Sequence, residues 1–379
     1  MKTHDLIDWL RLIQIPGLGP VGIRKLLGYF GHPQAVVRAS EPEYRAVPGI
    51  RPQIVEGLLG FRKKIPVEPV TDQLERLHRI GAKIITLGDG NYPDRLAQIH
   101  DPPPVLYVQG EAGHLVSPRM VAVVGSRRAS PGALEMARRL SDALARYQVT
   151  VVSGLALGVD SAAHRGALHG GGATVAVTAV GLDICYPASN QDLARQIMAK
   201  GCLITEAPLG TRPEAFRFPA RNRIISGLVQ AVVVVEAGEK SGALITSRLA
   251  LEQGREVFAV PGAAGDWRCK GSNRLLREGA GLIEEARDLL LEMHWPQTMT
   301  GTDSENQGRI SVESNSPVGR LLQCLGQGPM QADELARKSH LTVASLSSIL
   351  LQLELAGIVI RQPGNWFALQ NTPTHDTTS

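Results

Sequence analysis

A glycine and two arginines directly follow an apolar run in the middle of the chain. The run is Met120–Val124, and the turn after it consists of Gly125, Ser126, Arg127 and Arg128. An apolar run of this length is typical of a strand buried on both faces. Glycine lets the backbone approach a phosphate closely, and an arginine can hold one through two parallel hydrogen bonds. We therefore predict an anion-binding turn; the alternative is a solvated turn whose arginines pair with acidic side chains.

Cations and aromatic rings alternate in a second segment, residues 214–223. It reads EAFRFPARNR and contains Phe216, Arg217, Phe218, Arg221, Asn222 and Arg223. Only 4% of the chain is aromatic, so two rings among three arginines are unusual. Proteins that bind single strands combine cations for the phosphates with rings on which bases stack. The segment therefore predicts a single-strand-binding site; the alternative places both phenylalanines in the core and the arginines on a helix surface.

A third candidate is the glycine-containing segment Gly238–Gly242, which follows another apolar run. It lacks the glycines that the P-loop pattern requires, so ATP hydrolysis is not supported. We predict Ser241 as the N-cap of the next helix, with free N–H groups of Gly242 and Ala243 at the same rim. Lys240 would add a positive charge there.

Asp160 and His164 lie four residues apart and would share one face of a helix. The spacing is compatible with a metal or an acid–base pair, but no third ligand and no activated nucleophile lie at suitable spacing. We therefore favour a structural contact between the two side chains and predict no metal, no cofactor and no catalytic residue. The preceding Gly154 and Gly158 also lack the spacing and the acidic ribose ligand of a dinucleotide-binding fingerprint.

Apolar runs and helical patterns alternate through the middle of the chain, which predicts the frame for these groups. The expected strands are Met120–Val124, Val149–Val152, Thr174–Val180, Cys202–Glu206, Ala231–Glu236 and Glu256–Val260. Such alternation is typical of an α/β fold, an extended Rossmann-like parallel sheet with right-handed crossovers. Ligands of these sheets bind where strands end and helices begin, which is where the first and third segments lie. Residues 66–117 are expected to extend one edge of the sheet, so that the domain spans 66–295.

Residues 1–65 are predicted to form a small SAM-like helical domain. The segment Ile15–Leu27 resembles a helix–hairpin–helix, and a weaker copy follows it. One interpretation is two helical turns with a structural role. The other is contact with the DNA backbone through Gly17, Gly19 and Lys25.

The C-terminal part is predicted to contain a flexible linker, a winged-helix domain and a disordered tail, at residues 296–316, 317–370 and 371–379. Three helical patterns followed by a hairpin pattern are typical of the winged helix. The third helix, Thr342–Ala356, contains no Lys or Arg, whereas helices that read the major groove present basic or amide side chains. We therefore predict that this domain contributes little to DNA affinity and serves as a protein-contact or weak accessory module.

Composition places the chain among ordinary globular proteins of two or three domains. It has 379 residues, 43% of them hydrophobic, and a net charge of +4, which by itself does not establish nucleic-acid binding. The longest apolar runs are strand-sized and we find no secretory signal, so we expect no membrane contact. The four cysteines are far apart, which favours a reducing cytoplasm over disulfides or a metal site.

Together these motifs resemble the DNA-processing protein A family (DprA/Smf) over nearly the whole chain. The likeness is carried by VAVVGSRRAS, VVSGLALGVDSAAHRGAL, TVAVTAVGLDICYP, FPARNRIISGL and VVVVEAGEKSGALITSRLALEQGREVFAVPG. The resemblance implies a non-catalytic protein that binds single-stranded DNA and protects incoming strands during natural transformation. It also implies that the protein loads the RecA recombinase on these strands despite bound single-strand-binding protein, and that it forms a homodimer through the Rossmann-like domain.

The same resemblance maps a DNA-binding pocket onto the segments chosen above. The implied contacts are Gly125, Ser126, Arg127, Arg217, Phe218, Arg221, Asn222, Ser241 and Gly242. Arg128, Arg223 and Lys240 complete the predicted set because they lie in the same segments. Phe216 and Phe218 compete for the position of the stacking ring.

Two other function classes compete with this prediction. A related Rossmann family cleaves nucleoside monophosphates at the ribose and carries a P-G-G-x-G-T-x-x-E segment. The matching stretch here, Glu236–Thr246, lacks the paired glycines and the glutamate that would supply acid–base help. A sequence-specific repressor is disfavoured because the expected recognition helix lacks basic side chains.

Overall fold

The computed structural model describes residues 3–62, 68–297, 317–326, 328–355, 359–362 and 364–369. Contacts divide the chain into two units, Met1–Met299 and Thr300–Ser379. The tail predicted at residues 371–379 and all but the first two residues of the predicted linker lie outside the described residues. Among the helices that are described, none is long and apolar enough to cross a bilayer.

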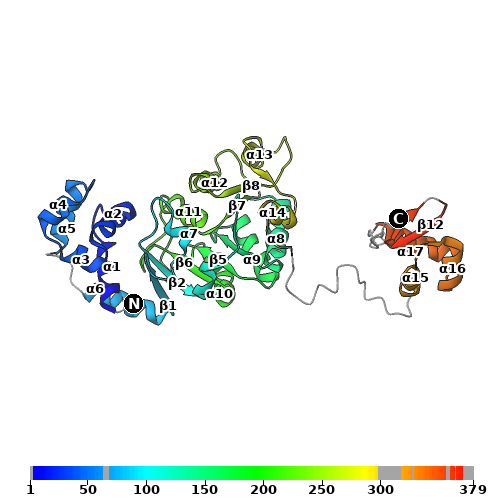
Figure 1. Cartoon of the computed structure of the whole chain (residues 1–379), viewed down its shortest axis with the longest axis horizontal. Helices are drawn as coiled ribbons and strands as arrows, with labels where there is room; N and C mark the ends of the chain where they lie inside the picture. Colours follow the sequence, from blue (N-terminus) through cyan, green and yellow to red (C-terminus); the bar gives the residue numbers. More distant parts are fainter. Residues whose placement is uncertain are drawn as a thin grey trace, which may run out of the picture. The chain divides into compact units, whose positions relative to one another are not determined.

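A nine-stranded sheet forms the centre of the first unit, with the order β1-β2-β6-β5-β4-β3-β7-β8-β9 (Figure 1). The strands are β1 (Ala82–Thr86), β2 (Val105–Gly110), β3 (Met120–Val124), β4 (Thr150–Ser153), β5 (Thr174–Val177), β6 (Cys202–Thr205), β7 (Ala231–Val234), β8 (Glu256–Ala259) and β9 (Gly281–Leu282). Strands β3 to β9 pair in parallel, and β1 and β2 extend the edge at β6 in antiparallel pairing. The predicted fold class and the edge extension are confirmed, and β9 is a strand that the sequence did not predict.

Helices cover both faces of this sheet. They are α7 (Asp94–Ala97), α8 (Pro131–Arg146), α9 (Val159–His169), α10 (Gln191–Lys200), α11 (Arg217–Leu228), α12 (Ala243–Glu252), α13 (Lys270–Arg277) and α14 (Ala286–Glu292). Successive side chains of β3 alternate between the faces. Met120, Ala122 and Val124 pack with α7, α11, α12 and α13, whereas Val121 and Val123 pack with α8, α9 and α14.

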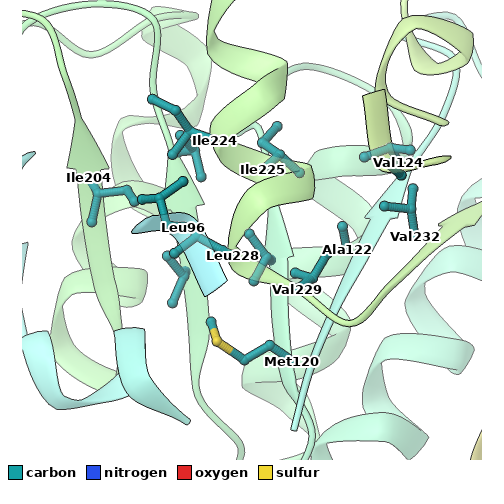
Figure 2. Packing of buried hydrophobic residues seen from close by; sticks show 14 of the residues in the cluster. Leu96, Met120, Ala122, Val124, Ile204, Ile224, Ile225, Leu228, Val229 and Val232 are labelled. Carbon is teal, nitrogen blue, oxygen red and sulfur yellow. The ribbon is translucent and has the colours of Figure 1, made fainter. Parts of the chain in front are cut away.

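The position of α11 is fixed by its apolar face. Ile224, Ile225 and Leu228 are at most 2% exposed and belong to a helix that packs against β3, β4 and β5 (Figure 2). Burial of such a side chain contributes about 1.5–3 kcal/mol. The helix therefore has a defined rotation on the sheet, and this rotation decides which of its arginines reach solvent.

The strand order creates a switch point between β3 and β7. From β3 the chain adds β4, β5 and β6 on one side, and then crosses over to add β7, β8 and β9 on the other. At such a reversal the connections leave the sheet in opposite directions, which opens a crevice at the carboxyl ends of the two strands. The turn at Gly125 and the loop at Gly238 meet there.

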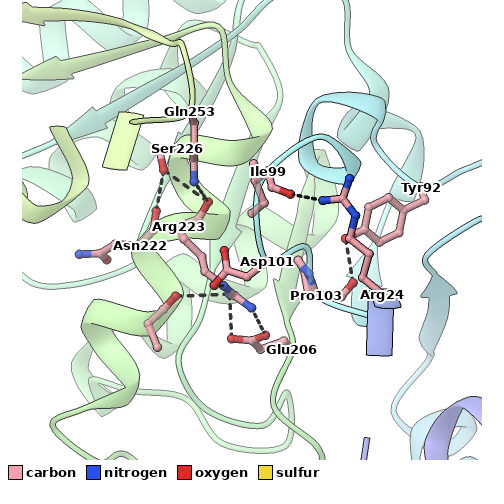
Figure 3. Close-up of polar contacts among 11 residues, drawn as sticks. Arg24, Tyr92, Ile99, Asp101, Pro103, Glu206, Asn222, Arg223, Ser226 and Gln253 are labelled. Carbon is pink, nitrogen blue, oxygen red and sulfur yellow. Dashed lines mark hydrogen bonds and ion pairs between the residues drawn. The ribbon is translucent and has the colours of Figure 1, made fainter. Parts of the chain in front are cut away.

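Within residues 3–62 and 68–81, the structure contains six helices, which share a core with one edge of the sheet. They are α1 (Thr3–Leu12), α2 (Pro20–Phe30), α3 (Pro33–Arg38), α4 (Glu41–Ala46), α5 (Pro52–Arg62) and α6 (Glu68–Arg79). Arg24 donates from Nη1 to the carbonyl oxygen of Ile99 at 2.8 Å (Figure 3). Lys25 Nζ donates to the carbonyl oxygen of Gly49 at 3.3 Å, so it joins α2 to the second glycine turn. This contact supports the structural interpretation of the helical region.

The second unit contains α15 (Pro317–Leu325), β10 (Met330–Gln331), α16 (Ala332–Ser339), α17 (Val343–Leu355), β11 (Val359–Gln362) and β12 (Trp366–Leu369). The strands form an antiparallel sheet in the order β10-β12-β11. Leu321, Leu335, Leu346 and Phe367 belong to its separate core. This arrangement of helices and hairpin confirms the predicted winged-helix domain.

Candidate nucleic-acid interface

A pocket of about 1000 Å³ opens at the switch point of the large sheet. The turn after β3, the loop after β7 and the first turns of α11 form its walls. Ten of the predicted site residues line it: Gly125, Ser126, Arg127, Arg128, Phe218, Arg221, Asn222, Lys240, Ser241 and Gly242. Arg217 and Arg223 are not among the residues that line it. The structure thus brings together three segments that are far apart in the sequence.

The turn at Gly125 is held between two neighbouring elements. Ser126 donates its backbone N–H to the carbonyl oxygen of Glu236 at 2.7 Å, and Val159 donates to the carbonyl oxygen of Ser126 at 3.2 Å. A Cβ atom on Gly125 would lie 2.6 Å from Val159 Cγ2, so a larger residue would push the turn outward. Gly158 has a φ of 80° and also leaves no space for a Cβ atom beside Ser126. The two glycines therefore fix the backbone position of the turn that carries Arg127.

Arg127 and Phe218 lie against each other in this pocket. The guanidinium carbon of Arg127 is 4.9 Å from the centre of the Phe218 ring, and the Tyr186 ring is 5.5 Å from Phe218 on a tilted plane. Among the described residues, no carboxylate lies within ion-pair distance of Arg127 or Arg128. A charge that is not neutralised by the protein and a ring beside it can serve a phosphate and a base at the same place.

Arg221 forms part of the pocket floor rather than its rim. Its side chain is buried and Nη1 donates to the carbonyl oxygens of Gly154, at 2.7 Å, and of Val177. Burial lowers the pKa of Arg221 to about 10, although the nearby Asp160 carboxylate acts in the opposite direction. The guanidinium is therefore still protonated at neutral pH and adds a positive charge beneath the pocket.

The predicted contact between Asp160 and His164 is not formed. Asp160 Oδ2 accepts from the backbone N–H groups of Gly154, at 3.1 Å, and Ala156, at 3.4 Å, and burial raises the pKa of Asp160. His164 is hydrogen-bonded through Nδ1 to Thr174 Oγ1 at 2.7 Å. Both side chains belong to α9, but Asp160 bonds to the loop after β4 and His164 bonds to the first residue of β5. Helical spacing alone does not predict these partners. Within the described residues, no group of three or more potential ligands could hold a metal ion.

Arg223 points away from the pocket and is neutralised by two carboxylates. Its Nε lies 2.9 Å from Asp101 Oδ2, and its Nη2 lies 2.6 Å from Glu206 Oε2 (Figure 3). Burial lowers the pKa of Arg223, but the two carboxylates more than offset this effect, so the net shift is upward. We therefore leave Arg223 out of the proposed contact surface.

Arg217 is also engaged, although at the surface. Its Nε lies 2.7 Å from Glu214 Oε2, and its guanidinium carbon lies 5.0 Å from the centre of the Phe216 ring. Phe216 is 66% exposed and does not line the pocket, whereas Phe218 does. This placement favours Phe218 for the stacking position that the sequence left open.

The loop after β7 differs from its prediction at one point. The N-cap of α12 is Gly242 rather than Ser241, and Ser241 Oγ accepts from the N–H of Ala243 at 3.3 Å. The N–H of Ala243, predicted to be free, therefore has the Ser241 hydroxyl as its partner. Lys240 is exposed at the rim, as its sequence position predicts.

Three of the aromatic and cationic residues that line the pocket were missed by sequence reasoning: Tyr186, Trp267 and Lys270. Trp267 and Lys270 follow β8, another strand whose carboxyl end lies at the same edge, so the rule applied to β3 and β7 would have found them. With Lys270, the cations that line the pocket are Arg127, Arg128, Arg221, Lys240 and Lys270, against the acids Asp160 and Glu239. The pocket is positive, with five cations and two acids.

Comparison with known proteins identifies the family. The sequence model of the family described as DNA recombination-mediator protein A matches residues 83–294, and that of the DprA winged helix domain matches residues 309–365. The chain belongs to the DNA recombination-mediator protein A family. Protein Smf of Escherichia coli (strain K12) is 34% identical over 376 residues, which cover 97% of this chain and 96% of the relative. Protein Smf of Synechocystis is 32% identical, covering 96% of this chain and 98% of the relative.

Two solved structures from the family share this fold. The X-ray structure of DNA processing protein A from Streptococcus pneumoniae has 34% identity and a TM-score of 0.68, and the match covers 77% of this chain and 99% of that one. DNA processing protein A from Helicobacter pylori has 29% identity and a TM-score of 0.52, with 56% of this chain and 95% of that one covered. The Helicobacter structure was described for its single-stranded DNA binding mode.

Proposed function

We propose that the pocket at the switch point binds single-stranded DNA and that the chain is a non-catalytic recombination mediator. The observation that carries this proposal is the pairing of Arg127 with the Phe218 ring in a pocket lined by five cations. Cations of this kind hold phosphates, and a ring inside a pocket can be reached by a base only if that base is unpaired. Membership of the DNA recombination-mediator protein A family and similarity to the Helicobacter protein support the same proposal.

The contact set that we propose is smaller than the predicted one. Arg127, Arg128, Lys240 and Lys270 would hold phosphates at the rim, and Phe218 would stack on a base. Gly125, Ser126, Asn222, Ser241 and Gly242 would shape the pocket and offer polar groups, with Arg221 beneath them.

The proposal extends to partners through the family resemblance. We infer that a homodimer, formed through the Rossmann-like domain, acts in the cytoplasm and loads RecA on incoming strands that carry single-strand-binding protein. Sedimentation at increasing protein concentration tests the dimer. Formation of RecA filaments on strands already covered by single-strand-binding protein, with and without this chain, tests the loading step.

A gel-shift experiment tests the binding step directly. Single- and double-stranded oligonucleotides of one length and sequence are titrated with the full chain at the same salt concentration. We expect the single strand to bind at least about tenfold more tightly, because stacking on Phe218 is open only to unpaired bases. Equal affinity for both forms would contradict the assignment of the pocket to single strands.

The competing enzyme hypothesis is not supported by Glu236. Glu236, the acid that begins the stretch compared with that family, is 2% exposed and accepts hydrogen bonds from Ser130, with 2.6 Å between Oε2 and the serine Oγ. A carboxylate held in this way caps α8 and is not available to a glycosidic bond. Incubation with AMP is expected to release no adenine, and release at the rate of an enzyme would overturn the non-catalytic assignment.

A further inference from the structure

A second, basic groove continues from the pocket along α13. It has a volume of about 540 Å³, and its polar lining includes Lys270, Asn273, Arg274 and Arg277. Glu239 and Lys270 line both the groove and the pocket, so the two hollows are contiguous. We propose that a bound single strand leaves the pocket over Trp267 and follows this groove, so that α13 carries an additional phosphate-binding site. The inference rests on the proposed function and names the path of the strand.

The charges of the groove favour a polyanion. Within the described residues, Arg277 and Lys270 have no carboxylate at ion-pair distance, and Arg274 has only a surface pair with Glu278 at 3.5 Å. Cations in the last turn of a helix interact favourably with its dipole, which accounts for Arg274 and Arg277 without a ligand. Lys270 begins the helix, where the dipole disfavours a cation, and the first turn contains no acid. A phosphate shared by Lys270 and the rim would compensate this unfavourable placement.

The groove is held rigidly against the loop that carries Lys240. Gly271 donates its N–H to the carbonyl oxygen of Ala237 at 2.7 Å, and a Cβ atom on Gly271 would lie 2.7 Å from the carbonyl oxygens of Ala237 and Gly238. Asn273 fixes the opposite wall, because its side chain accepts from Gly262 N–H at 3.0 Å and donates to Gly262 O at 2.9 Å. The cations of α13 therefore keep a defined position relative to the pocket.

Trp267 supplies a ring on the wall of the pocket, near Lys270, which the pocket shares with the groove. It is 68% exposed and lines the pocket together with Lys270, three residues further along the chain. The neighbouring Arg268 is paired with Asp266 at 2.7 Å, so this loop presents the ring and not a second free cation beside it. A large exposed ring next to a phosphate-binding lysine is the combination that stacks a base without sequence preference.

The length of the oligonucleotide separates the pocket from the groove. Thymidine oligonucleotides of about 5 and about 20 nucleotides are titrated over a range of salt concentrations with wild type, Arg277→Ala and a control variant. Arg195→Ala is the control, because Arg195 is also an exposed arginine, lies on α10 and lines neither hollow. We expect Arg277→Ala to reduce the salt slope by about 0.7 for the long oligonucleotide only, with a loss of affinity of about twofold to fivefold. Unchanged slopes with both lengths would overturn the groove.

Tryptophan fluorescence gives a second readout. Trp267→Ala is expected to weaken binding of the long oligonucleotide by about fivefold or more, whereas Trp267→Phe keeps a ring and most of the affinity. Quenching of wild-type emission by the long oligonucleotide should disappear in Trp267→Phe, and quenching that persists unchanged would contradict the contact. If the wild type does not bind even the short oligonucleotide, the proposed pocket itself is wrong. If the wild type binds the short oligonucleotide but substitutions at Trp267 and Arg277 do not affect binding of the long one, only the proposed groove is wrong.

Discussion

The guanidinium carbon of Arg127 lies 4.9 Å from the centre of the Phe218 ring, although Arg127 lies in the turn after β3 and Phe218 lies in the first turn of α11. This contact orients the arginine without neutralising it, since a ring offers a weak attraction and no formal charge. The position of Arg127 is therefore set before a ligand arrives, and its hydrogen-bond donors are still available. Preorganisation of this kind lowers the entropic cost of binding a flexible strand.

Replacement of Arg127 should change the salt dependence of binding. With about 3 to 5 phosphates neutralised per protomer, the logarithm of affinity should fall with the logarithm of salt at a slope of roughly −2 to −3.5. Arg127→Ala should flatten the slope by about 0.7 and weaken binding, because one fewer counterion is released. Fluorescence anisotropy at several salt concentrations measures both quantities, and equal slopes for variant and wild type would refute the phosphate assignment.

Phe218 and Phe216 form a matched pair for testing base stacking. Phe218→Ala should cost about 1–3 kcal/mol of binding free energy with little change in salt slope, because stacking releases no counterions. Phe216→Ala should have little effect on either quantity, since this ring lies outside the pocket despite its greater exposure. Equilibrium titrations of both variants decide the matter, and the reverse ranking would assign the stacking position to Phe216.

Arg223 is predicted to act on stability and not on DNA affinity. Arg223→Ala leaves the carboxylates of Asp101 and Glu206 without their partner, and their side chains are 39% and 31% exposed. We expect a loss of about 1–3 kcal/mol in the free energy of unfolding, below the cost at a fully buried pair because water reaches both acids. Urea denaturation measures this loss, with Arg217→Ala as a surface-pair control that should cost less than about 1 kcal/mol. A flattened salt slope in Arg223→Ala would place the residue back at the DNA.

His164 makes stability depend on pH. Burial lowers its folded-state pKa to about 3, while the unfolded chain keeps the ordinary value near 6.5. As the pH falls below about 6.5, only the unfolded chain takes up this proton, so the free energy of unfolding decreases by about 1.4 kcal/mol per pH unit until about pH 3. Above about pH 6.5 the group contributes no pH dependence.

His164→Gln removes this titration and keeps an amide that can bond to Thr174. Between about pH 7.5 and pH 5.5, wild type should lose about 1.4 kcal/mol more stability than the variant. Urea denaturation of both proteins at the two pH values measures the difference. Comparison of two proteins cancels the contribution of Asp160, whose raised pKa acts in the opposite direction. Parallel pH dependence would show that His164 is not buried as a neutral group.

The winged-helix domain is predicted to add little to DNA binding. A truncated chain that ends at Met299 retains the first unit with the pocket and the groove. We expect its affinity for single strands to fall by less than about tenfold, because α17 offers no basic side chain for a groove or a phosphate. A larger loss in the same titration would assign DNA contacts to the second unit.

Much of the frame could be predicted because its signals are local. The apolar runs of β3 and β7 and the glycines after them identified the sheet and two walls of the pocket. The phase of α11 was also within reach of the sequence. Phe218, Arg221 and Asn222 fall on one side of a helix, whereas Arg223, about 100° further than Asn222, turns away. A prediction that treats the segment only as a run of cations and rings ignores this helical phase and includes Arg223 among the contacts.

Other features depend on contacts that no local pattern contains. Asp101 lies 122 residues from Arg223, and Glu206 comes from the end of a different strand. Tyr186 reaches Phe218 from an irregular segment after β5, and its position depends on how that segment folds back over the sheet. The contacts of such side chains can be predicted only when the strand order is known.

The strand order has a consequence for the life of the chain. The arginine turn follows β3 and the lysine loop follows β7, so the two halves of the binding site are synthesised at separate times and meet only when β7 docks beside β3. A nascent or partly degraded chain that lacks β7 would contain Arg127 but would not bind single-stranded DNA. A DNA strand bound to both loops would contact residues from the earlier and the later part of the polypeptide. We therefore expect the site to bind DNA only after β7 has paired with β3.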